Sequence, residues 1–327
     1  MTTPAPSTTP DEAAASYAKH GLFWMKDILT PGEVEVLRQA AQQKFSEVLR
    51  TLLVRHIVAS SSGDEPPPPV RYAEVVERDG GRYDSRHGFG EAPFSSLLRE
   101  GGLGAALVPA LRSVLGDHAE VVAVGQIVAM SPGGWELLDD EAGDQGWHTD
   151  GRYGNLETDA LTVFLPLRDY TETNGPTEFL LGSHVEPRAA ECAALTDDAR
   201  AAAATTLHLR AGEAVAFDYR LWHRGLANTE LADRPVLYAI IGRPVFTADG
   251  LKGVPVLDRG GSESLLRPGT EVAPAPSFRV GAPQMPSAHV EEAEPLEAAA
   301  ATTTRGSAPA PAPSAASGRV LRKRSRG

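Results

Sequence analysis

Short segments of β-type sequence dominate the chain from Glu120 to Gly242, and they limit the possible folds more than any other feature. The segments are rich in Val, Ile, Leu, Phe and Thr, and turn-forming residues separate several of them. No helical pattern of the kind that connects parallel strands lies between them. They span residues 120–130, 160–167, 177–181, 205–209, 214–219 and 236–242. This pattern predicts a mainly β protein with flanking helices, either a sandwich or a jelly roll.

The N-terminal part of the chain carries helix signals instead. A capping-box start with a proline in the first turn occupies residues 30–33, and apolar residues then recur at helical spacing, which predicts a helix from about 31 to 53. The segment SSSGDEPPPP at 60–69 interrupts regular structure. A second apolar segment, 97–115, predicts further helix.

The domain boundaries follow from these patterns. We expect helical support over about 13–118 and a jelly-roll core over about 119–246, within one domain at 13–268. Residues 1–12 and 269–327 are rich in Ala, Pro, Ser, Thr and Glu, and this composition buries too little apolar surface to offset the entropy of ordering the chain. Both ends are therefore predicted to be disordered tails.

The predicted C-terminal tail changes charge along its length. An acidic part, HVEEAEPLE at 289–297, precedes an Ala/Pro/Thr stretch and a basic end, RVLRKRSRG at 319–327. The basic end is compatible with a docking or targeting element, including nuclear targeting. It is equally compatible with a solvated tail that has no partner.

Charge and cysteine content exclude several classes of protein. The 43 acidic and 31 basic residues give a formal net charge of -12, so the folded domain would repel nucleic acid, and small molecules are the expected partners. Cys192 is the only cysteine, which excludes an intrachain disulfide and a Cys-based zinc site. The sequence has neither a run of about 20 apolar residues nor a secretory signal, so we expect an intracellular, cytoplasmic protein without a membrane span.

His148 and Asp150 are candidate metal ligands. They stand two residues apart in WHTDG, and in an extended strand the side chains of residues i and i+2 point to the same face. Spacing alone does not select them, because three other His-x-acid pairs occur. These are His118 with Glu120, His184 with Glu186, and His289 with Glu291. Only His148 is followed by Asp, and the other pairs lie in turns or in a predicted tail.

His223 is the expected third ligand. It follows directly on the strand predicted at 214–219, and a jelly roll would return it to the neighbourhood of His148. Two imidazoles and one carboxylate on one face of a metal ion leave three coordination positions open, as non-haem Fe(II) oxygenases require for a co-substrate and O2. Each histidine taken singly could instead be a hydrogen-bonded core residue.

Arg234 stands at the entrance to the strand predicted at 236–242, eleven residues after His223. A guanidinium that projects into the barrel needs a carboxylate partner, which a diacid co-substrate would supply, whereas a surface arginine beside Asp233 is the alternative. With these residues in view, the chain resembles the phytanoyl-CoA dioxygenase family of Fe(II)/2-oxoglutarate-dependent oxygenases over most of residues 17–245. The matching segments are GLFWMKDILTPGEVEVLR (21–38), WHTDG (147–151), NGPTEFLLGSH (174–184) and AGEAVAFDYRLWHRGLANTELADRPVLY (211–238).

The resemblance implies a double-stranded β-helix, which is a cupin-like jelly roll with helices packed outside. It implies that His148, Asp150 and His223 hold Fe(II). It also implies that Arg234 pairs with the distal carboxylate of 2-oxoglutarate. The residues implied to line the co-substrate pocket are Gln126, Thr162 and Phe164.

The implied reaction uses O2 to decarboxylate 2-oxoglutarate to succinate and CO2, and oxidises an unactivated C–H bond of a small-molecule substrate. Hydroxylation is the default outcome, although relatives also desaturate, epoxidise or form rings. Asp150 is retained where halogenating relatives have a small residue, so halogenation is not expected. Gly225 replaces a hydroxyl residue with which many relatives hold the co-substrate, so that contact is missing.

Candidate substrate contacts come from RDGGRYDSRHGFG at 78–90, a polar segment rich in glycine and aromatic residues that is typical of a loop over a jelly-roll mouth. Arg82, Tyr83 and Arg86 could meet a polar or anionic substrate there. Arg152, just after the metal motif, is the better-placed cation. An ordinary surface loop explains the segment equally well.

Two other functions fit the same residues. A cupin-like metal enzyme that does not use 2-oxoglutarate would leave Arg234 without a role. A non-catalytic binding protein on the same fold would not bind iron. Succinate formation separates the first alternative from the oxygenase, and metal binding separates the second.

Overall fold

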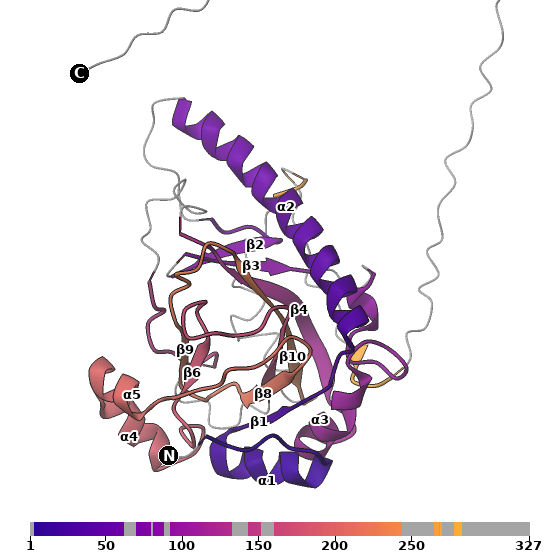
Figure 1. Ribbon diagram of the computed structural model, residues 1–327, viewed down its shortest axis with the longest axis vertical. Coiled ribbons are helices and arrows are strands. Elements are labelled where there is room, and N and C mark those ends of the chain that lie inside the picture. Colours follow the sequence, from indigo (N-terminus) through magenta and orange to yellow (C-terminus); the bar gives the residue numbers. More distant parts are fainter. Residues whose placement is uncertain are drawn as a thin grey trace, which may run out of the picture. The chain divides into compact units, whose positions relative to one another are not determined.

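Two antiparallel sheets form the frame of the protein (Figure 1). The larger sheet has the strand order β1-β8-β5-β10-β4-β3-β2, with β11 paired to β4, and the smaller has the order β7-β6-β9. The strands are β1 (Leu22–Met25), β2 (Val75–Arg78), β3 (Arg82–Arg86), β4 (Glu120–Ala129), β5 (Ala160–Pro166), β6 (Thr177–Phe179), β7 (Thr205–Thr206), β8 (Ala214–Asp218), β9 (His223–Gly225), β10 (Arg234–Gly242) and β11 (Phe278–Arg279). The predicted mainly β fold with flanking helices, a double-stranded β-helix, is confirmed.

The structure is a computed structural model, and everything described below belongs to one unit of the chain, Met1–Gln284. The described residues are 3–61, 70–79, 81–87, 92–132, 143–151, 160–243, 265–267, 269 and 278–282.

Helices cover the outer face of the larger sheet. Figure 1 shows α2 lying along β2, β3 and β4, with α1 and α3 side by side at one end. The helices are α1 (Pro10–His20), α2 (Pro31–Ser61), α3 (Val108–Leu115), α4 (Arg188–Ala194) and α5 (Asp197–Ala203). The helix predicted at 31–53 is thus present and longer, whereas only the last part of 97–115 is α-helical. Among the described helices, none is long and apolar enough to span a membrane.

The central strands are buried on both faces, and alternation along them separates two environments. In β5, Leu161 and Val163 pack with the helices in one apolar cluster, whereas Phe164 packs between the sheets in another. In β10, Leu237 belongs to the helix-facing cluster and Tyr238 to the inner one. Because successive side chains of a strand point to opposite faces, only every second residue of these strands can reach the interior.

The prediction of a disordered N-terminal tail is wrong for residues 3–12. Thr9 caps α1 in a capping box with Glu12, and Pro10 occupies the first turn. Upstream of the helix, the indole of Trp24 donates a hydrogen bond to the carbonyl of Pro4, and the Ser7 amide donates to the carbonyl of Trp24. The prediction rested on the Ala- and Pro-rich composition and overlooked the capping box at Thr9.

The predicted boundary at residue 268 also needs correction. β11 pairs with β4, and the Val280 amide donates a hydrogen bond to the carbonyl of Ala119. The Arg99 guanidinium lies over the Phe278 ring, 3.6 Å from its centroid. The folded unit therefore includes residues 278–282, while the acidic part at 289–297 and the basic end at 319–327 lie outside the described residues.

Part of the segment predicted to be a loop at 78–90 belongs to a hairpin, while residues 80 and 88–90 lie outside the described residues. β2 and β3 pair in antiparallel register from Val75 opposite Ser85 to Arg78 opposite Arg82, and β3 pairs with β4 on its other side. The strand was missed because its inward residues are polar, which removes the alternation of apolar and polar residues that normally marks a strand.

Candidate functional site

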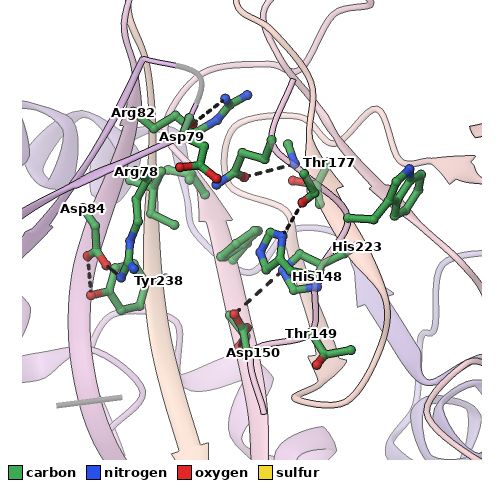
Figure 2. Close-up of a pocket in the computed structure, with 18 of the residues that line it drawn as sticks. Arg78, Asp79, Arg82, Asp84, His148, Thr149, Asp150, Thr177, His223 and Tyr238 are labelled. Carbon is green, nitrogen blue, oxygen red and sulfur yellow. Dashed lines mark hydrogen bonds and ion pairs between the residues drawn. The ribbon is translucent and has the colours of Figure 1, made fainter. Parts of the chain in front are cut away.

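An isolated antiparallel bridge brings two of the predicted metal ligands together. The backbone amide of His148 donates a hydrogen bond to the carbonyl of His223, and the amide of His223 donates to the carbonyl of His148. The imidazole centroids are 4.4 Å apart, and His223 Nε2 lies 3.9 Å from Asp150 Oδ1. Ligand atoms of all three side chains lie within 4.8 Å of one another. Figure 2 shows them beside one cavity.

Hydrogen bonds orient these ligands from behind. Nδ1 of His148 lies 2.8 Å from the carbonyl oxygen of Gly146, and Nδ1 of His223 lies 2.9 Å from that of Leu221. Each contact fixes a tautomer in which Nε2 is unprotonated and can bind a metal. Thr162 donates a hydrogen bond of 2.8 Å to Asp150 Oδ2, which leaves Oδ1 on the side of the imidazoles. This donor set fits a divalent metal ion with open coordination positions.

The two other His-x-acid pairs in the described part of the chain show no such convergence. Among the described residues, His148, Asp150 and His223 are the only group that could hold a metal ion. His184 is buried instead against α1, with its ring centroid 5.6 Å from that of Tyr17, and burial lowers the pKa of its imidazole. His289 lies outside the described residues.

A cavity of about 460 Å³ opens beside the metal-ligand cluster. The predicted pocket residues Thr162 and Phe164 line it, as do Arg82 and Arg234. Its other lining residues are Arg71, Glu77, Arg78, Asp79, Asp84, Ile127, Gln145, Gly146, Trp147, His148, Thr149, Asp150, Thr177, Tyr219, His223, Gly225, Val236, Tyr238 and Ile240. A volume of this size suits a small-molecule site.

Arg234 is buried at this cavity and is held by backbone carbonyls. Its Nε donates a hydrogen bond to the carbonyl of Asn174, its Nη2 donates to that of Gly175, and its Nη1 donates to the Tyr170 hydroxyl. The guanidinium carbon lies 4.9 Å from the Tyr170 ring centroid. These neutral partners orient the group without neutralising its charge, and no carboxylate of the described residues forms an ion pair with it.

Two predicted site residues face away from the cavity. Gln126, which was expected to line the co-substrate pocket, is fully buried on the outer face of β4, where its Nε2 donates a hydrogen bond to the carbonyl of Ala41 on α2. Its neighbour Ile127 faces the cavity instead. Tyr83 packs against Phe45 on the outer face of β3. Both errors are a shift of one residue along a strand, which exchanges the two faces.

The remaining candidate substrate residues have different outcomes. Arg82, also on β3, is only 1% exposed and points into the cavity. Arg86 lies at the end of β3 and is not among the residues that line the cavity. Arg152 lies outside the described residues, so its contact with substrate stays a prediction.

Sequence reasoning missed a polar network on the opposite side of the cavity from the metal ligands (Figure 2). Asp84 accepts hydrogen bonds from Arg78 Nη2 at 2.5 Å and from the Tyr238 hydroxyl at 2.7 Å. Burial and the nearby carboxylate raise the pKa of Tyr238 well above its ordinary value, so its hydroxyl stays a donor. The register of β10 could have revealed Tyr238, because it lies four residues after Arg234 on the same face.

Comparison with known proteins agrees with this geometry. The family model described as phytanoyl-CoA dioxygenase (PhyH) matches residues 17–236, which is more than half of the chain.

Solved structures show a similar fold. The non-heme alpha ketoglutarate dependent epimerase SnoN from nogalamycin biosynthesis is 18% identical, with a TM-score of 0.52 over 85% of this chain and 96% of that chain. SnoN in complex with Fe3+, alpha ketoglutarate and nogalamycin RO is 19% identical, with a TM-score of 0.50 over the same shares of the two chains. AviO1 from Streptomyces viridochromogenes Tue57 is 19% identical, with a TM-score of 0.50 over 73% of this chain and 97% of that chain.

Proposed function

The chain belongs to the phytanoyl-CoA dioxygenase family of Fe(II)- and 2-oxoglutarate-dependent oxygenases, and we propose that it hydroxylates an unactivated C–H bond of a small-molecule substrate. The observation that carries the proposal is the convergence of two imidazole Nε2 atoms and one Asp150 oxygen at a cavity that also contains a buried guanidinium. A keto-diacid such as 2-oxoglutarate binds through chelation of the metal at one end and through a cation that pairs with its distal carboxylate at the other. This cavity has residues for both.

Each of these residues has a defined task in the proposal. His148, Asp150 and His223 hold the iron and leave three positions for the co-substrate and O2. Arg234 binds the distal carboxylate of 2-oxoglutarate in bidentate geometry. Iron bound here would couple the oxidative decarboxylation of 2-oxoglutarate to substrate oxidation.

Thr162 and Phe164 complete the co-substrate side of the cavity. Thr162 keeps Asp150 oriented through its hydrogen bond, and the Phe164 ring supplies apolar surface from the same strand. Since Asp150 provides a carboxylate ligand, no coordination position is left for a halide in addition to O2 and the keto acid. Hydroxylation is therefore favoured over halogenation.

The substrate is proposed to be a small molecule with polar groups. The network of Arg78, Asp84 and Tyr238 supplies charged and hydroxyl groups across the cavity from the iron ligands, where they could orient such a molecule. Arg152 remains a proposed contact of an anionic group.

Succinate formation tests this function. Purified protein supplied with Fe(II), 2-oxoglutarate and O2 should form succinate when mixed with fractionated small-molecule extracts, and the rate should rise with the fraction that contains the substrate. His148→Ala should abolish this activity because two remaining ligands hold a divalent ion poorly. His184→Ala is the matched control and should retain it.

The alternatives predict different results. A cupin-like enzyme that does not use 2-oxoglutarate would bind one iron per chain and consume O2 with an extract fraction, but it would form no succinate. A non-catalytic binding protein would bind no iron. Either result would contradict the proposed function.

A further inference from the structure

We propose that Arg82 supplies a second positive charge for the distal carboxylate of 2-oxoglutarate, from the space that Gly225 leaves open. The proposal rests on the proposed function and assigns Arg82 to the co-substrate rather than to the substrate. The evidence is the packing of its guanidinium against Gly225 and beside Arg234, at the cavity that the metal ligands also line.

Gly225 makes room for this guanidinium. A Cβ atom at residue 225 would lie 3.0 Å from Arg82 Nε, 3.1 Å from Arg82 Nη2 and 2.8 Å from Gln145 Oε1. A side chain at this position and the Arg82 guanidinium therefore compete for the same space. Gly225 lacks the hydroxyl that the family resemblance implies two residues after His223, and the Arg82 guanidinium from β3 lies against this position instead.

Arg82 and Arg234 are fixed to the same pair of chain segments. Arg82 Nη2 donates a hydrogen bond to the carbonyl of Leu226, and Arg234 Nη2 donates to the carbonyl of Gly175. These segments are joined by a hydrogen bond from the Leu226 amide to the carbonyl of Pro176. Backbone carbonyls of two hydrogen-bonded segments therefore hold both guanidinium groups, and one of these segments begins just after His223.

The positive charges of Arg82 and Arg234 repel each other, while nearby acidic side chains attract Arg82. The pKa of Arg82 is lowered to about 9. Burial is the main cause and the positive charge of Arg234 the second, while Asp144, Tyr170 and Asp79 raise this pKa. A carboxylate bound between two buried cations would relieve their repulsion, and its attraction to both is strong where water is excluded.

A purely structural role for Arg82 is the competing explanation, because its Nη1 also donates to the carbonyl of Gly143 at 3.1 Å. The two explanations differ in ligand specificity. A charge that acts on the distal carboxylate affects 2-oxoglutarate but not 2-oxobutanoate, which chelates a metal in the same way and has no distal carboxylate. A structural role affects both keto acids alike.

The test is an anaerobic titration of Fe(II) protein with each keto acid, followed by the metal-to-ligand absorption of the chelate. Arg82→Gln should weaken 2-oxoglutarate by roughly tenfold or more, as expected when one charge near a buried anion is lost, and should leave 2-oxobutanoate within about twofold. Arg82→Lys should recover part of the loss because it keeps the charge. Arg50→Gln, which removes an exposed arginine of α2 that does not line the cavity, is the control and should leave both midpoints unchanged.

A second pair of variants tests the exchange at residue 225. Gly225→Ser should weaken 2-oxoglutarate because its Cβ displaces the guanidinium, whereas adding Gly225→Ser to Arg82→Ala should strengthen binding relative to Arg82→Ala alone. This reversal of sign is a coupling that independent sites would not show.

The outcomes separate this inference from the function on which it rests. Equal losses for both keto acids in Arg82→Gln, or no loss for either, would overturn the role of Arg82 while leaving the oxygenase in place. Wild-type protein that binds iron but gives no absorption with 2-oxoglutarate would overturn the proposed function itself.

Discussion

At the residue scale, the hydrogen bond from Thr162 holds the Asp150 carboxylate in an orientation that suits metal binding. Thr162→Val keeps the shape of the side chain but removes the donor to Asp150 Oδ2. We expect the dissociation constant for Fe(II) to rise by roughly tenfold or more, as is usual when a group behind a metal ligand is lost. Thr177→Val removes a hydroxyl from the same cavity without touching a ligand and should leave iron affinity unchanged. Equal affinities in the two variants would contradict this role.

His87 predicts an acid limit for stability. Its ring stacks on Phe94 with the centroids 3.8 Å apart, and neither ring nitrogen has a hydrogen-bond partner among the described residues. Burial, followed by the charge of Lys44, lowers its pKa to about 3. Since the unfolded chain takes up a proton near pH 6.5 and the folded chain does not, stability is full above pH 6.5 and falls as the pH decreases toward 3.

The expected loss from His87 is about 2 kcal/mol between pH 6.5 and pH 5, at about 1.4 kcal/mol per pH unit. Urea unfolding of wild-type protein and His87→Leu over this range measures it, because the difference in slope isolates His87 from the other histidines. Parallel pH profiles would show that the folded protein accommodates the charged ring.

At the element scale, a part-buried side-chain hydrogen bond links α1 to β8 of the jelly roll. The Tyr17 hydroxyl donates to Asp218 Oδ2 at 2.6 Å, and Asp218, which is fully buried, also accepts from Arg220. Tyr17→Phe leaves a buried carboxylate with one partner fewer, so we expect the free energy of unfolding to fall by roughly 1–3 kcal/mol.

A matched control for Tyr17 is Tyr83→Phe. Tyr83 is buried, whereas Tyr17 is partly buried, and no described residue forms a hydrogen bond with the Tyr83 hydroxyl, so this variant should lose less than about 0.5 kcal/mol. Denaturant unfolding of both variants measures the difference. Equal losses would mean that the contact with Asp218 does not anchor the helix.

The same scale shows which parts of the fold the sequence can predict. Strands β5, β8 and β10 were recognisable because both of their faces are buried in apolar clusters, which gives continuous runs of apolar residues. The hairpin of β2 and β3 was not, because Arg82 and Asp84 point into a polar cavity. The short helices α4 and α5 were missed between predicted strands, although Thr196 caps α5 by accepting a hydrogen bond from the Ala199 amide.

The site was predictable to the extent that its chemistry lies in local spacing. His148, Asp150, His223 and Arg234 were identified from motif and order along the chain, and all four line the cavity. The face of a strand residue depends on register, which sequence fixes poorly in β4, where apolar residues occupy both faces. Gln126 was misplaced for this reason.

At the scale of the whole molecule, the folded unit requires the segment that contains β11. A chain ending at Gly269 would lose the pairing of β11 with β4 and the hydrogen bonds from the amide of Val280 to Ala119 and from Arg112 to the carbonyl of Val280. At about 1 kcal/mol for each hydrogen bond, we expect Tm to fall by roughly 5–10 °C. A chain ending at Gln284 keeps these contacts and should melt within about 2 °C of the full chain. Identical Tm values for the two truncated chains would contradict the assignment.

The central claim is that one cavity holds iron and 2-oxoglutarate together, and Arg234 tests it most directly. Arg234→Leu removes the guanidinium that is to bind the distal carboxylate, which costs about 2–5 kcal/mol when one partner of a buried charge pair is lost. Arg234→Lys should recover only part, because an ammonium lacks the two-pronged geometry.

The measurement is the titration of 2-oxoglutarate into anaerobic Fe(II) protein, with the absorption of the iron chelate as the signal and iron content as the control. The account predicts one iron per chain in both proteins and a midpoint at least roughly thirtyfold higher in Arg234→Leu than in wild type, at about 1.4 kcal/mol per decade. An unchanged midpoint in a variant that retains its iron would contradict it.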